Sequence, residues 1–323
     1  MSRNKDTKIS RRGFVIAGGL LAGAAGISSP VRAAMPFAKA QAPGFYRRNL
    51  GAFEITAVLD GDLDLELSLF AGDRKDIERL SSQSYQPSPP RIHCNAFAVN
   101  TGEKLYLVDT GSGALMGSSL GRAAANLVLA GINLDQIDAV LLTHLHPDHV
   151  GGLTVEGRPA FKNADIYVSE DDAKFWLGKE AADKAPAEMK PFFQMASDAV
   201  KPYAHRLRPL PKSGEIAPGV TVIALPGHTA GHTGYLFASG KEQMLVWGDI
   251  VHNAALQFPR PEITLAFDTD QQQAAQARKR AFDMAATDHL LVAGMHLPWP
   301  GIGYVEKSGE LYRYHPDFWN TRF

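Results

Sequence analysis

The chain is poor in cysteine and has no excess of charge of either sign. Its single cysteine, Cys94, excludes an intramolecular disulfide and any zinc finger built on cysteines. The 33 Lys and Arg residues nearly balance the 34 Asp and Glu residues, so the overall charge gives no reason to expect nucleic acid as a partner. We expect Cys94 to be a buried small hydrophobic residue, because no pattern places a base beside it.

The sequence also lacks a hydrophobic run long enough to span a bilayer. The candidate run, residues 14–27, has 14 residues, whereas a membrane-spanning helix needs about 20. It follows Arg11 and Arg12 and precedes a small-residue site that ends at Ala33, a pattern that resembles the twin-arginine export signal. We therefore predict a cleaved signal peptide over residues 1–33, no stable membrane anchor, and a periplasmic or secreted mature protein.

Removal of residues 1–33 would make the protein mildly acidic. That segment holds six of the 33 basic residues and one of the 34 acidic residues, so residues 34–323 keep 27 and 33 and carry a net charge of −6. Such a charge does not supply a nucleic-acid-binding surface. With 45% hydrophobic and 21% charged residues, the chain can bury a full core in one large domain or two small ones.

Apolar strands alternate with helical patterns in both halves of the chain. In the first half, a strand over residues 53–59 is predicted to end at Asp60, and a helix over residues 120–130 precedes a buried strand at residues 139–143. The second half repeats the pattern with three apolar strands at residues 220–225, 244–247 and 290–293, and a helix over residues 270–286 entered through Asp268-Thr269-Asp270. Between the halves, residues 171–200 are helix-compatible, and we interpret them as a helical insertion.

The residues that carry chemistry follow the buried strand of the first half. Directly after it come four side chains that can bind metal within six residues, namely His144, His146, Asp148 and His149. Alternation along an extended segment points His144 and His146 the same way, and the turn into the next helix brings Asp148 and His149 around from the side. The spacing therefore indicates two adjacent metal positions. The alternative interpretation is a polar loop of solvated histidines.

Three further ionisable residues each follow an apolar strand of the second half, namely His228, Asp249 and His296. Open α/β folds place their sites at the carboxyl ends of strands. Taken singly, each residue is as well explained as a polar residue at the protein surface. Taken with the first cluster, they complete a ligand set for two metal ions, and we predict that all seven residues bind metal.

At these residues the sequence resembles the metallo-β-lactamase superfamily. The resemblance covers residues 45–316 and includes Val108-Asp109-Thr110-Gly111, which looks like the first motif of that family. It implies one domain, an αββα sandwich with two metal ions at one edge and a helical insertion at about residues 170–204. It further implies a first metal position made by His144, His146 and His228, a second made by Asp148, His149 and His296, and a bridging Asp249. Asp109 and His232 are then expected to support ligands without binding metal.

A pair of divalent ions in such a site favours hydrolysis. Two ions about 3.5 to 4 Å apart that share a hydroxide provide a nucleophile at neutral pH, because the pKa of the bound water falls to about 7. The candidate catalytic carboxylates are Asp148 and Asp249. Imidazole and carboxylate ligands suit Zn²⁺ best, while iron, manganese and cobalt remain open.

Within the superfamily, the sequence is most similar to the methyl parathion hydrolase group of aryl-ester, lactone and organophosphate hydrolases. The matching stretches are residues 42–47, 146–153, 183–186, 257–258 and 300–303. The bridging Asp249 argues against the β-lactamase branch, and His146 argues against the redox diiron relatives, which carry Glu at that position. The acidic mature chain argues against the nuclease branch.

The resemblance also suggests a substrate pocket. In the methyl parathion hydrolase group, aromatic residues of the insertion hold the leaving group, a role that carries over to Trp176, Phe192 and Phe193. The alternative is that they are ordinary helical core residues. Further pocket positions are Met116, His252 and Phe267, where the organophosphate hydrolase has other residues. His252 is equally well explained as a residue behind the ligands.

These residues lead to a prediction of substrate class. A large Phe267 beside the metals would exclude a tetrahedral phosphotriester more than a planar ester. We therefore predict a dinuclear metal-dependent hydrolase of small apolar carboxyl esters or lactones, with aryl esters favoured and phosphotriester hydrolysis as a secondary activity. The alternatives are phosphotriester hydrolysis as the main activity and, from another class, a metal-containing oxidoreductase of the same fold. A homodimer is left open.

Overall fold

The computed structural model describes residue 35 and residues 37–321. The predicted signal peptide, residues 1–33, lies outside the described residues. The chain divides into two units, residues 1–42 and residues 43–323, and the described part of the first unit contains no helix or strand. Among the described residues, none of the helices has the length and hydropathy that a bilayer crossing requires.

Two seven-stranded sheets form the centre of the second unit. The first has the order β1-β2-β4-β5-β6-β9-β10, with bounds Phe45–Leu50, Phe53–Asp64, Arg91–Asn100, Leu105–Val108, Ala139–Leu141, Asp165–Ser169 and Leu207–Leu210. The second has the order β11-β12-β13-β14-β16-β17-β18, with bounds Gly214–Ala217, Val220–Ala224, Thr233–Ser239, Glu242–Val246, Leu291–Ala293, Ile302–Ser308 and Leu311–Pro316. Two small two-stranded antiparallel sheets pair β3 (Phe70–Ala71) with β15 (Thr264–Leu265) and β7 (Thr154–Val155) with β8 (Arg158–Pro159).

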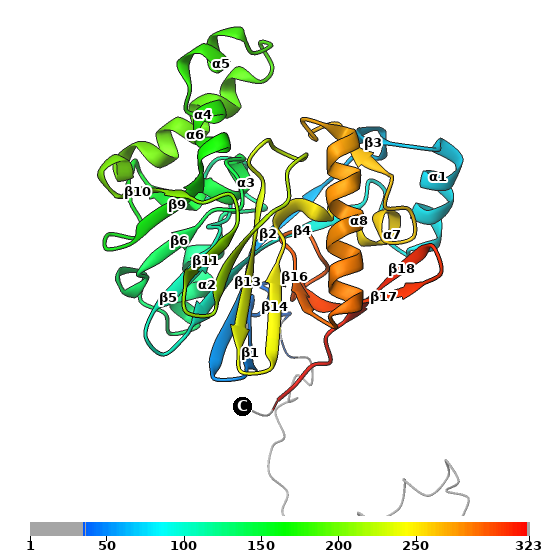
Figure 1. Ribbon diagram of the computed structural model, residues 1–323, viewed down its shortest axis with the longest axis horizontal. Coiled ribbons are helices and arrows are strands. Elements are labelled where there is room, and N and C mark those ends of the chain that lie inside the picture. The colour runs from blue at the N-terminus through cyan, green and yellow to red at the C-terminus, as the bar shows by residue number, and fades with distance from the viewer. Residues whose placement is uncertain (1–34, 36, 322–323) are drawn as a thin grey trace, which may run out of the picture. The chain divides into compact units, whose positions relative to one another are not determined.

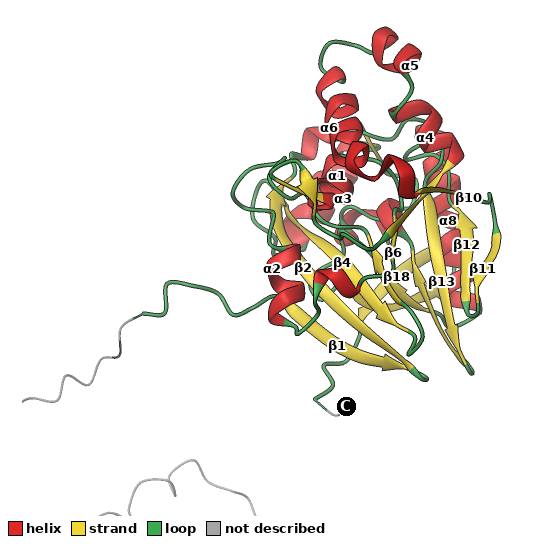
Figure 2. Cartoon of the chain, turned by 90° about the vertical axis from the view of Figure 1, so that its left-hand side faces the viewer, coloured by secondary structure: helices red, strands yellow, loops and turns green. Residues whose placement is uncertain are grey.

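The helices lie on the outer faces of these sheets and above one edge of the sandwich (Figures 1 and 2). Their bounds are α1 Arg74–Gln83, α2 Ala123–Leu129, α3 Pro147–Val150, α4 Glu170–Trp176, α5 Lys179–Lys184, α6 Lys190–Val200, α7 Ala254–Gln257 and α8 Gln271–Thr287. Asp270 caps the last of them by accepting a hydrogen bond from the Gln273 backbone N–H. The helix entry predicted from the sequence is therefore confirmed at this residue.

Alternating side chains on the strands produce the layers. In β5, Val108 belongs to the core between the two sheets, and Leu107 points to the helix side, where it packs with Leu127 of α2. In β16, Ala293 faces the other sheet while Val292 packs with residues of α8. Each sheet thus has one face in a shared core and one face under helices. The αββα sandwich predicted from the resemblance is confirmed.

The strand predicted to end at Asp60 continues to Asp64, so that prediction is wrong. The register of β2 against β4 shifts between Leu59 and Gly61, which lets the strand pass through a bulge. The Asp60 carboxylate is buried and accepts hydrogen bonds from the backbone N–H groups of Ser112, Gly121 and Ala123. An aspartate usually ends a strand. Here β2 continues through Asp60, because N–H groups from another part of the chain satisfy the buried carboxylate oxygens.

The helices α4, α5 and α6 occupy residues 170–200 and stand above the sheets (Figure 1). They connect β9 to β10, which are parallel neighbours, so the chain leaves the first sheet after Ser169 and returns to it at Leu207. Ser169 caps α4 by accepting a hydrogen bond from the Asp172 backbone N–H. The helical segment therefore begins at the carboxyl end of β9, next to β6, after which the predicted ligands His144, His146, Asp148 and His149 follow.

Candidate metal centre

The seven predicted metal ligands lie beside one another, although four separate segments supply them. His144, His146, Asp148 and His149 follow β6, with the last two on α3, and His228 lies between β12 and β13. Asp249 follows β14, and His296 follows β16. The strands β6, β14 and β16 end in residues that leave the core at the same edge of the sandwich, as expected for a site at the carboxyl ends of strands.

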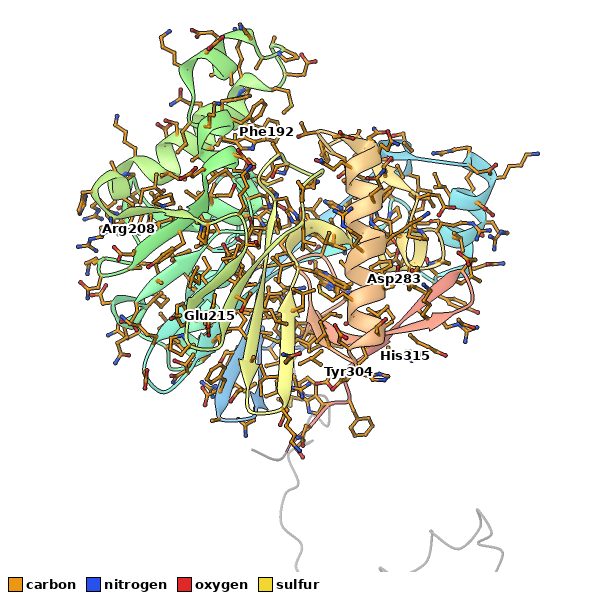
Figure 3. The ribbon with its side chains drawn as sticks, in the orientation of Figure 1. Phe192, Arg208, Glu215, Asp283, Tyr304 and His315 are labelled. Carbon is orange, nitrogen blue, oxygen red and sulfur yellow. The ribbon has the colours of Figure 1, made fainter. Side chains whose placement is uncertain are left out.

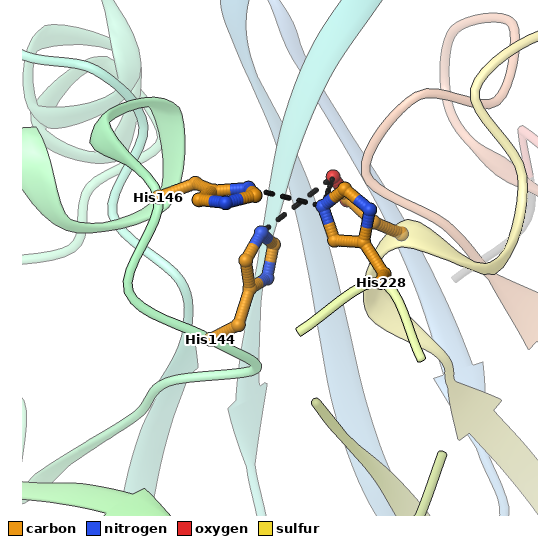
Figure 4. A group of neighbouring side chains, drawn as sticks. His144, His146 and His228 are labelled. Carbon is orange, nitrogen blue, oxygen red and sulfur yellow. Dashed lines mark hydrogen bonds and ion pairs between the residues drawn. The ribbon is translucent and has the colours of Figure 1, made fainter. Parts of the chain in front are cut away.

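The first group consists of three histidines around Asp249. His144, His146, His228 and Asp249 offer ligand atoms that all lie within 4.8 Å of one another. The Oδ2 atom of Asp249 lies 3.7 Å from His144 Nε2 and 3.3 Å from His228 Nε2, and His146 Nδ1 lies 3.0 Å from His228 Nε2. Figure 4 shows the three rings pointing toward one another.

The second group lies on the other side of Asp249. His149 Nε2 lies 3.3 Å from Asp249 Oδ1, and His296 Nε2 lies 3.2 Å from Asp249 Oδ2. Asp148 Oδ2 completes the group at 3.5 Å from His149 Nε2 and 3.4 Å from His296 Nε2. Asp249 therefore contacts both groups.

These separations fit ligands around metal ions. Two ligand atoms, each about 2.1 Å from one ion at a tetrahedral angle, lie about 3.4 Å apart, close to the distances between the facing atoms here. His144 Nε2, His149 Nε2 and Asp249 Oδ1 are buried and have no hydrogen-bond partner. Buried polar atoms without partners are costly, and shared ions would satisfy all three. The donor set, five imidazoles and two carboxylates, suits Zn²⁺.

Buried acceptors behind the candidate ligands orient the rings of His149 and His296. Nδ1 of His149 lies 2.7 Å from Asp109 Oδ2, and Asp109 is fixed in turn by the backbone N–H of Thr143. Nδ1 of His296 donates to the backbone oxygen of His93 at 2.9 Å. Each ring then presents Nε2 to the centre, as required of a neutral metal ligand.

Two further residues support the site from behind. Nδ1 of His228 lies 2.8 Å from Oδ1 of Asp268, a residue to which the sequence analysis gave no site role. His232, expected to support ligands, donates from Nδ1 to the Leu225 backbone oxygen and accepts from the Asp249 backbone N–H at Nε2. His232 therefore positions the backbone of Asp249 and does not face the two groups.

Burial and mutual charge set the protonation of the site. Burial lowers the pKa of His144 and of His146 well below the ordinary value. Burial also acts against ionisation of Asp249, but the surrounding histidines, led by His149, hold its pKa well below the usual range. Burial opposes protonation of His149, His228 and His296 too, but Asp249 and the other carboxylates raise the pKa of His149 and His296 well above the ordinary value and that of His228 to about 9. A divalent cation would therefore bind the carboxylate and the neutral rings of His144 and His146 directly, and would displace a proton from each of the other three rings.

Cys94 is buried as expected, but the expectation that no base lies beside it is wrong. Its Sγ lies 3.8 Å from His296 Nδ1 and 4.0 Å from Asp148 Oδ2. This neighbour was not predictable, because Cys94 is in β4 and meets residues that are far away in the sequence. Burial raises the pKa of the thiol to about 12, so the sulfur stays protonated at neutral pH.

A pocket of about 570 Å³ opens onto the two groups. All six predicted pocket residues line it, namely Met116, Trp176, Phe192, Phe193, His252 and Phe267. Phe192 lies where the helical insertion meets the rest of the unit (Figure 3). Sequence reasoning missed four residues that line the same pocket, namely Phe175, Leu63 on β2, Leu65 just after β2, and Ile92 on β4. The walls are mostly apolar, and the ionisable residues concentrate at the metal-binding groups.

Individual pocket residues differ in their exposure. Trp176 is buried, with its ring centroid 5.0 Å from that of His146, whereas Met116 and Phe267 are 38% and 44% exposed. His252 is buried, and its Nε2 lies 3.1 Å from Asp249 Oδ2. His252 thus lines the pocket and also contacts the central carboxylate.

Known proteins share both the sequence pattern and the fold. The family model described as the Metallo-beta-lactamase superfamily matches residues 89–296, a range that contains all seven candidate ligands. The crystal structure of the hydrolase AbOPH in the beta lactamase superfamily is 35% identical with a TM-score of 0.83, and the match covers 87% of this chain and 100% of that chain. AidC, a dizinc quorum-quenching lactonase solved with the product N-hexnoyl-L-homoserine, is 26% identical with a TM-score of 0.80, covering 86% and 99%.

Curated relatives match shorter stretches. The probable metallo-hydrolase YybB of Bacillus subtilis is 26% identical over 168 residues, which is 48% of this chain and 67% of YybB. Ribonuclease Z of Mycobacterium marinum is 32% identical over 114 residues, which is 35% of this chain. The chain spans only 32% of the length of that ribonuclease.

Proposed function

The chain belongs to the metallo-beta-lactamase superfamily, and on this premise we propose that it is a dinuclear metal-dependent hydrolase of carboxyl esters or lactones. The observation that carries the proposal is the convergence of seven candidate ligand side chains, six of them around Asp249, at an apolar pocket. The residues fit Zn²⁺, so we propose two zinc ions. When bound, two such ions lower the pKa of a water between them to about 7 and polarise the substrate carbonyl.

The residues of this chain perform the remaining tasks. Asp249 holds both ligand groups together, and Asp148 belongs to the second group, so these two carboxylates are the proposed catalytic residues. Asp109 and Asp268 orient the rings of His149 and His228. Fixed rings leave little reorganisation for the reaction itself. The apolar walls bind the organic part of the substrate and displace water from it.

The pocket favours a slim substrate at the metal-binding groups. Phe267 and His252 both line it, and His252 stands directly beside Asp249. A carbonyl group is planar, whereas a phosphotriester is tetrahedral and needs more width at the same place. The dizinc lactonase AidC, with 26% identity over almost its whole length, supports the lactone assignment. We therefore propose small apolar esters or lactones, with aryl esters favoured, as substrates.

A second candidate is phosphotriester hydrolysis as the main activity. It is compatible with the aromatic cluster of Phe175, Trp176 and Phe193, whose ring centroids lie 4.8 to 5.2 Å apart. Such a cluster can hold an aryl leaving group of either substrate class. The cluster also fits the proposed similarity to the methyl parathion hydrolase group. We therefore keep phosphotriester hydrolysis as the second proposal.

A hydrolysis screen tests these proposals. Residues 34–323, reconstituted with zinc, would be assayed against aryl esters, lactones, a dialkyl aryl phosphate and the β-lactam nitrocefin, with the His146→Ala variant as the inactive control. The highest kcat/KM is expected for an ester or lactone, with little or no turnover of nitrocefin. A dialkyl aryl phosphate as the best substrate would establish the second candidate instead. Iron with visible absorbance in the purified protein, without hydrolysis of any substrate, would favour a metal-containing oxidoreductase.

A further inference from the structure

One buried carboxylate joins the helical insertion to the first metal position. Asp172, in the first turn of α4, is 0% exposed. Its Oδ2 accepts a hydrogen bond from the backbone N–H of Leu145 at 3.1 Å, and its Oδ1 accepts one from the backbone N–H of Gly231 at 2.8 Å. The two oxygens thus hold two different loops.

Both loops carry ligands of the same metal position. Leu145 lies between His144 and His146, so the hydrogen bond to its N–H fixes the backbone from which both rings project. Gly231 belongs to the turn that starts with His228 and ends next to β13. The separation of these two loops sets the distance between His146 Nδ1 and His228 Nε2. That distance is 3.0 Å.

The helix and the second loop are in close contact. A Cβ atom added at Gly231 would lie 1.9 Å from Ser169 Oγ and 2.5 Å from the backbone nitrogen of Asp172. Only a glycine therefore allows the backbone of this turn to reach the start of α4. A shift of the start of α4 would therefore also shift the loop that contains Gly231.

The same helix continues into the substrate pocket. Trp176, one turn after Asp172, has its ring centroid 5.0 Å from His146 and 4.8 Å from Phe193. Phe175 lines the pocket beside it. One helix of seven residues thus contacts the ligand loops at its beginning and forms the pocket wall at its end.

We propose that Asp172 is a positioning residue that fixes the separation of the two histidine loops and thereby sets the metal affinity of the first position, made by His144, His146 and His228. This inference rests on the proposed dinuclear centre. Asp172 touches neither substrate nor metal ligand side chains, and it acts through the backbones of Leu145 and Gly231. Replacement by Asn puts an NH₂ group against one of the two backbone N–H donors, so one hydrogen bond is lost and that loop moves away.

The test measures each metal position separately. In the His296→Ala background the first position is intact, and in the His146→Ala background the second is intact. Zinc affinity of each is measured in competition with a chromophoric chelator, with and without Asp172→Asn. We expect a 10- to 100-fold weaker affinity in the first background, the usual effect of losing an outer hydrogen bond to a metal site, and less than a threefold change in the second. The control is Asp171→Asn, a neighbour whose side chain is 51% exposed, and it should change neither affinity.

A second variant keeps the test decisive if Asp172→Asn does not fold. In Gly231→Ala the added Cβ pushes the His228 loop away from the start of α4. This variant should show the same selective loss of zinc affinity at the first position. Equal losses at both positions, or unchanged affinities at both, would overturn the inference, because they indicate a role in stability alone. A parent protein that binds no zinc at either position would overturn the proposed function as well.

Discussion

Oδ1 of Asp268 lies 2.8 Å from Nδ1 of His228, and this carboxylate orients the ring toward the centre. Its other oxygen accepts a hydrogen bond from the Leu265 backbone N–H at 2.8 Å, so the carboxylate itself is fixed before it orients the histidine. Asp109 and His149 form the corresponding pair of the second position, at 2.7 Å. Each metal position therefore contains one histidine that a buried carboxylate holds in place.

We predict that Asp268→Asn weakens zinc binding at the first position by about 10- to 100-fold, because the amide cannot replace the carboxylate as a partner that both orients the ring and raises its basicity. Competition with a chelator measures the affinity. The control is Glu262→Gln, whose side chain is 58% exposed and which contacts no ligand. An unchanged affinity in Asp268→Asn would show that His228 is held by other contacts.

The same pair predicts how the stability of the metal-free protein depends on pH. Burial opposes protonation of His228, but Asp249 and Asp268 raise its pKa to about 9, above the value of about 6.5 in an unfolded chain. The stabilisation from its proton is fully present below pH 6.5 and is lost as the pH rises to 9. Urea unfolding of chelator-treated protein should therefore show a falling free energy of unfolding across this window. Asp268→Asn should make the fall smaller, and an equal fall would contradict the assignment.

The central carboxylate provides a direct test of the metal assignment. Asp249→Ala removes the side chain that contacts both groups, and His146→Ala removes a ligand of the first group only. We expect metal content to fall in both variants, further in Asp249→Ala, and activity to fall by orders of magnitude. Elemental analysis and steady-state assays check this. Wild-type metal content and turnover in both variants would remove the basis of the site.

The seven candidate ligands could be chosen from the sequence because a local pattern marks each one, and the structure brings all seven into neighbouring groups. Four lie in one short run after a buried strand, and the other three each follow an apolar strand. Asp268 and Asp172 were not assigned to the site, because an inward-facing aspartate at a helix start looks like an ordinary cap. Asp268 precedes the true cap, Asp270, by two residues, and its partner His228 is 40 residues away. The contact between Cys94 and His296 was likewise not predictable from local sequence, since the two residues are 202 positions apart.

The layers of the fold also followed from pattern, whereas the bulge in β2 did not. Apolar runs identified the strands, and the αββα sandwich came from the family resemblance. Asp60 was expected to end β2 because aspartate and glycine disfavour strands. Its carboxylate is instead satisfied by N–H groups of residues 112, 121 and 123, a contact between segments that no local pattern can reveal.

Export remains a prediction, since residues 1–33 lie outside the described residues. We propose that Arg11 and Arg12 form the address that a twin-arginine receptor reads, so the protein would be exported to the periplasm or beyond. Replacing both by Lys should leave the uncleaved precursor in the cytoplasm. Cell fractionation with an antibody to the mature chain measures this. Normal processing of the double variant would point to the general secretory route or to no export.

The choice of esters over phosphotriesters depends on the width of the pocket beside the metal-binding groups. Phe267 and His252 both line the pocket, and His252 lies beside Asp249. We predict that Phe267→Leu with His252→Leu raises kcat/KM for a dialkyl aryl phosphate and lowers it for an aryl lactone. The combined change is expected on the order of 1 to 3 kcal/mol, the usual scale for reshaping a pocket. Aryl-ester turnover should change less.

The single variants separate pocket shape from effects on the metal centre. His252 Nε2 lies 3.1 Å from Asp249 Oδ2, so His252→Leu removes a contact of the central carboxylate, and metal content has to be measured first. Phe267 is 44% exposed, lines the pocket and is not one of the candidate ligands, so Phe267→Leu tests pocket width alone. Phe318→Leu, at an 87% exposed position that does not line the pocket, is the matched control. If the ratio of lactone to phosphotriester turnover stays constant in Phe267→Leu and in the double variant, pocket width does not decide the substrate class, and the ester proposal loses its physical support.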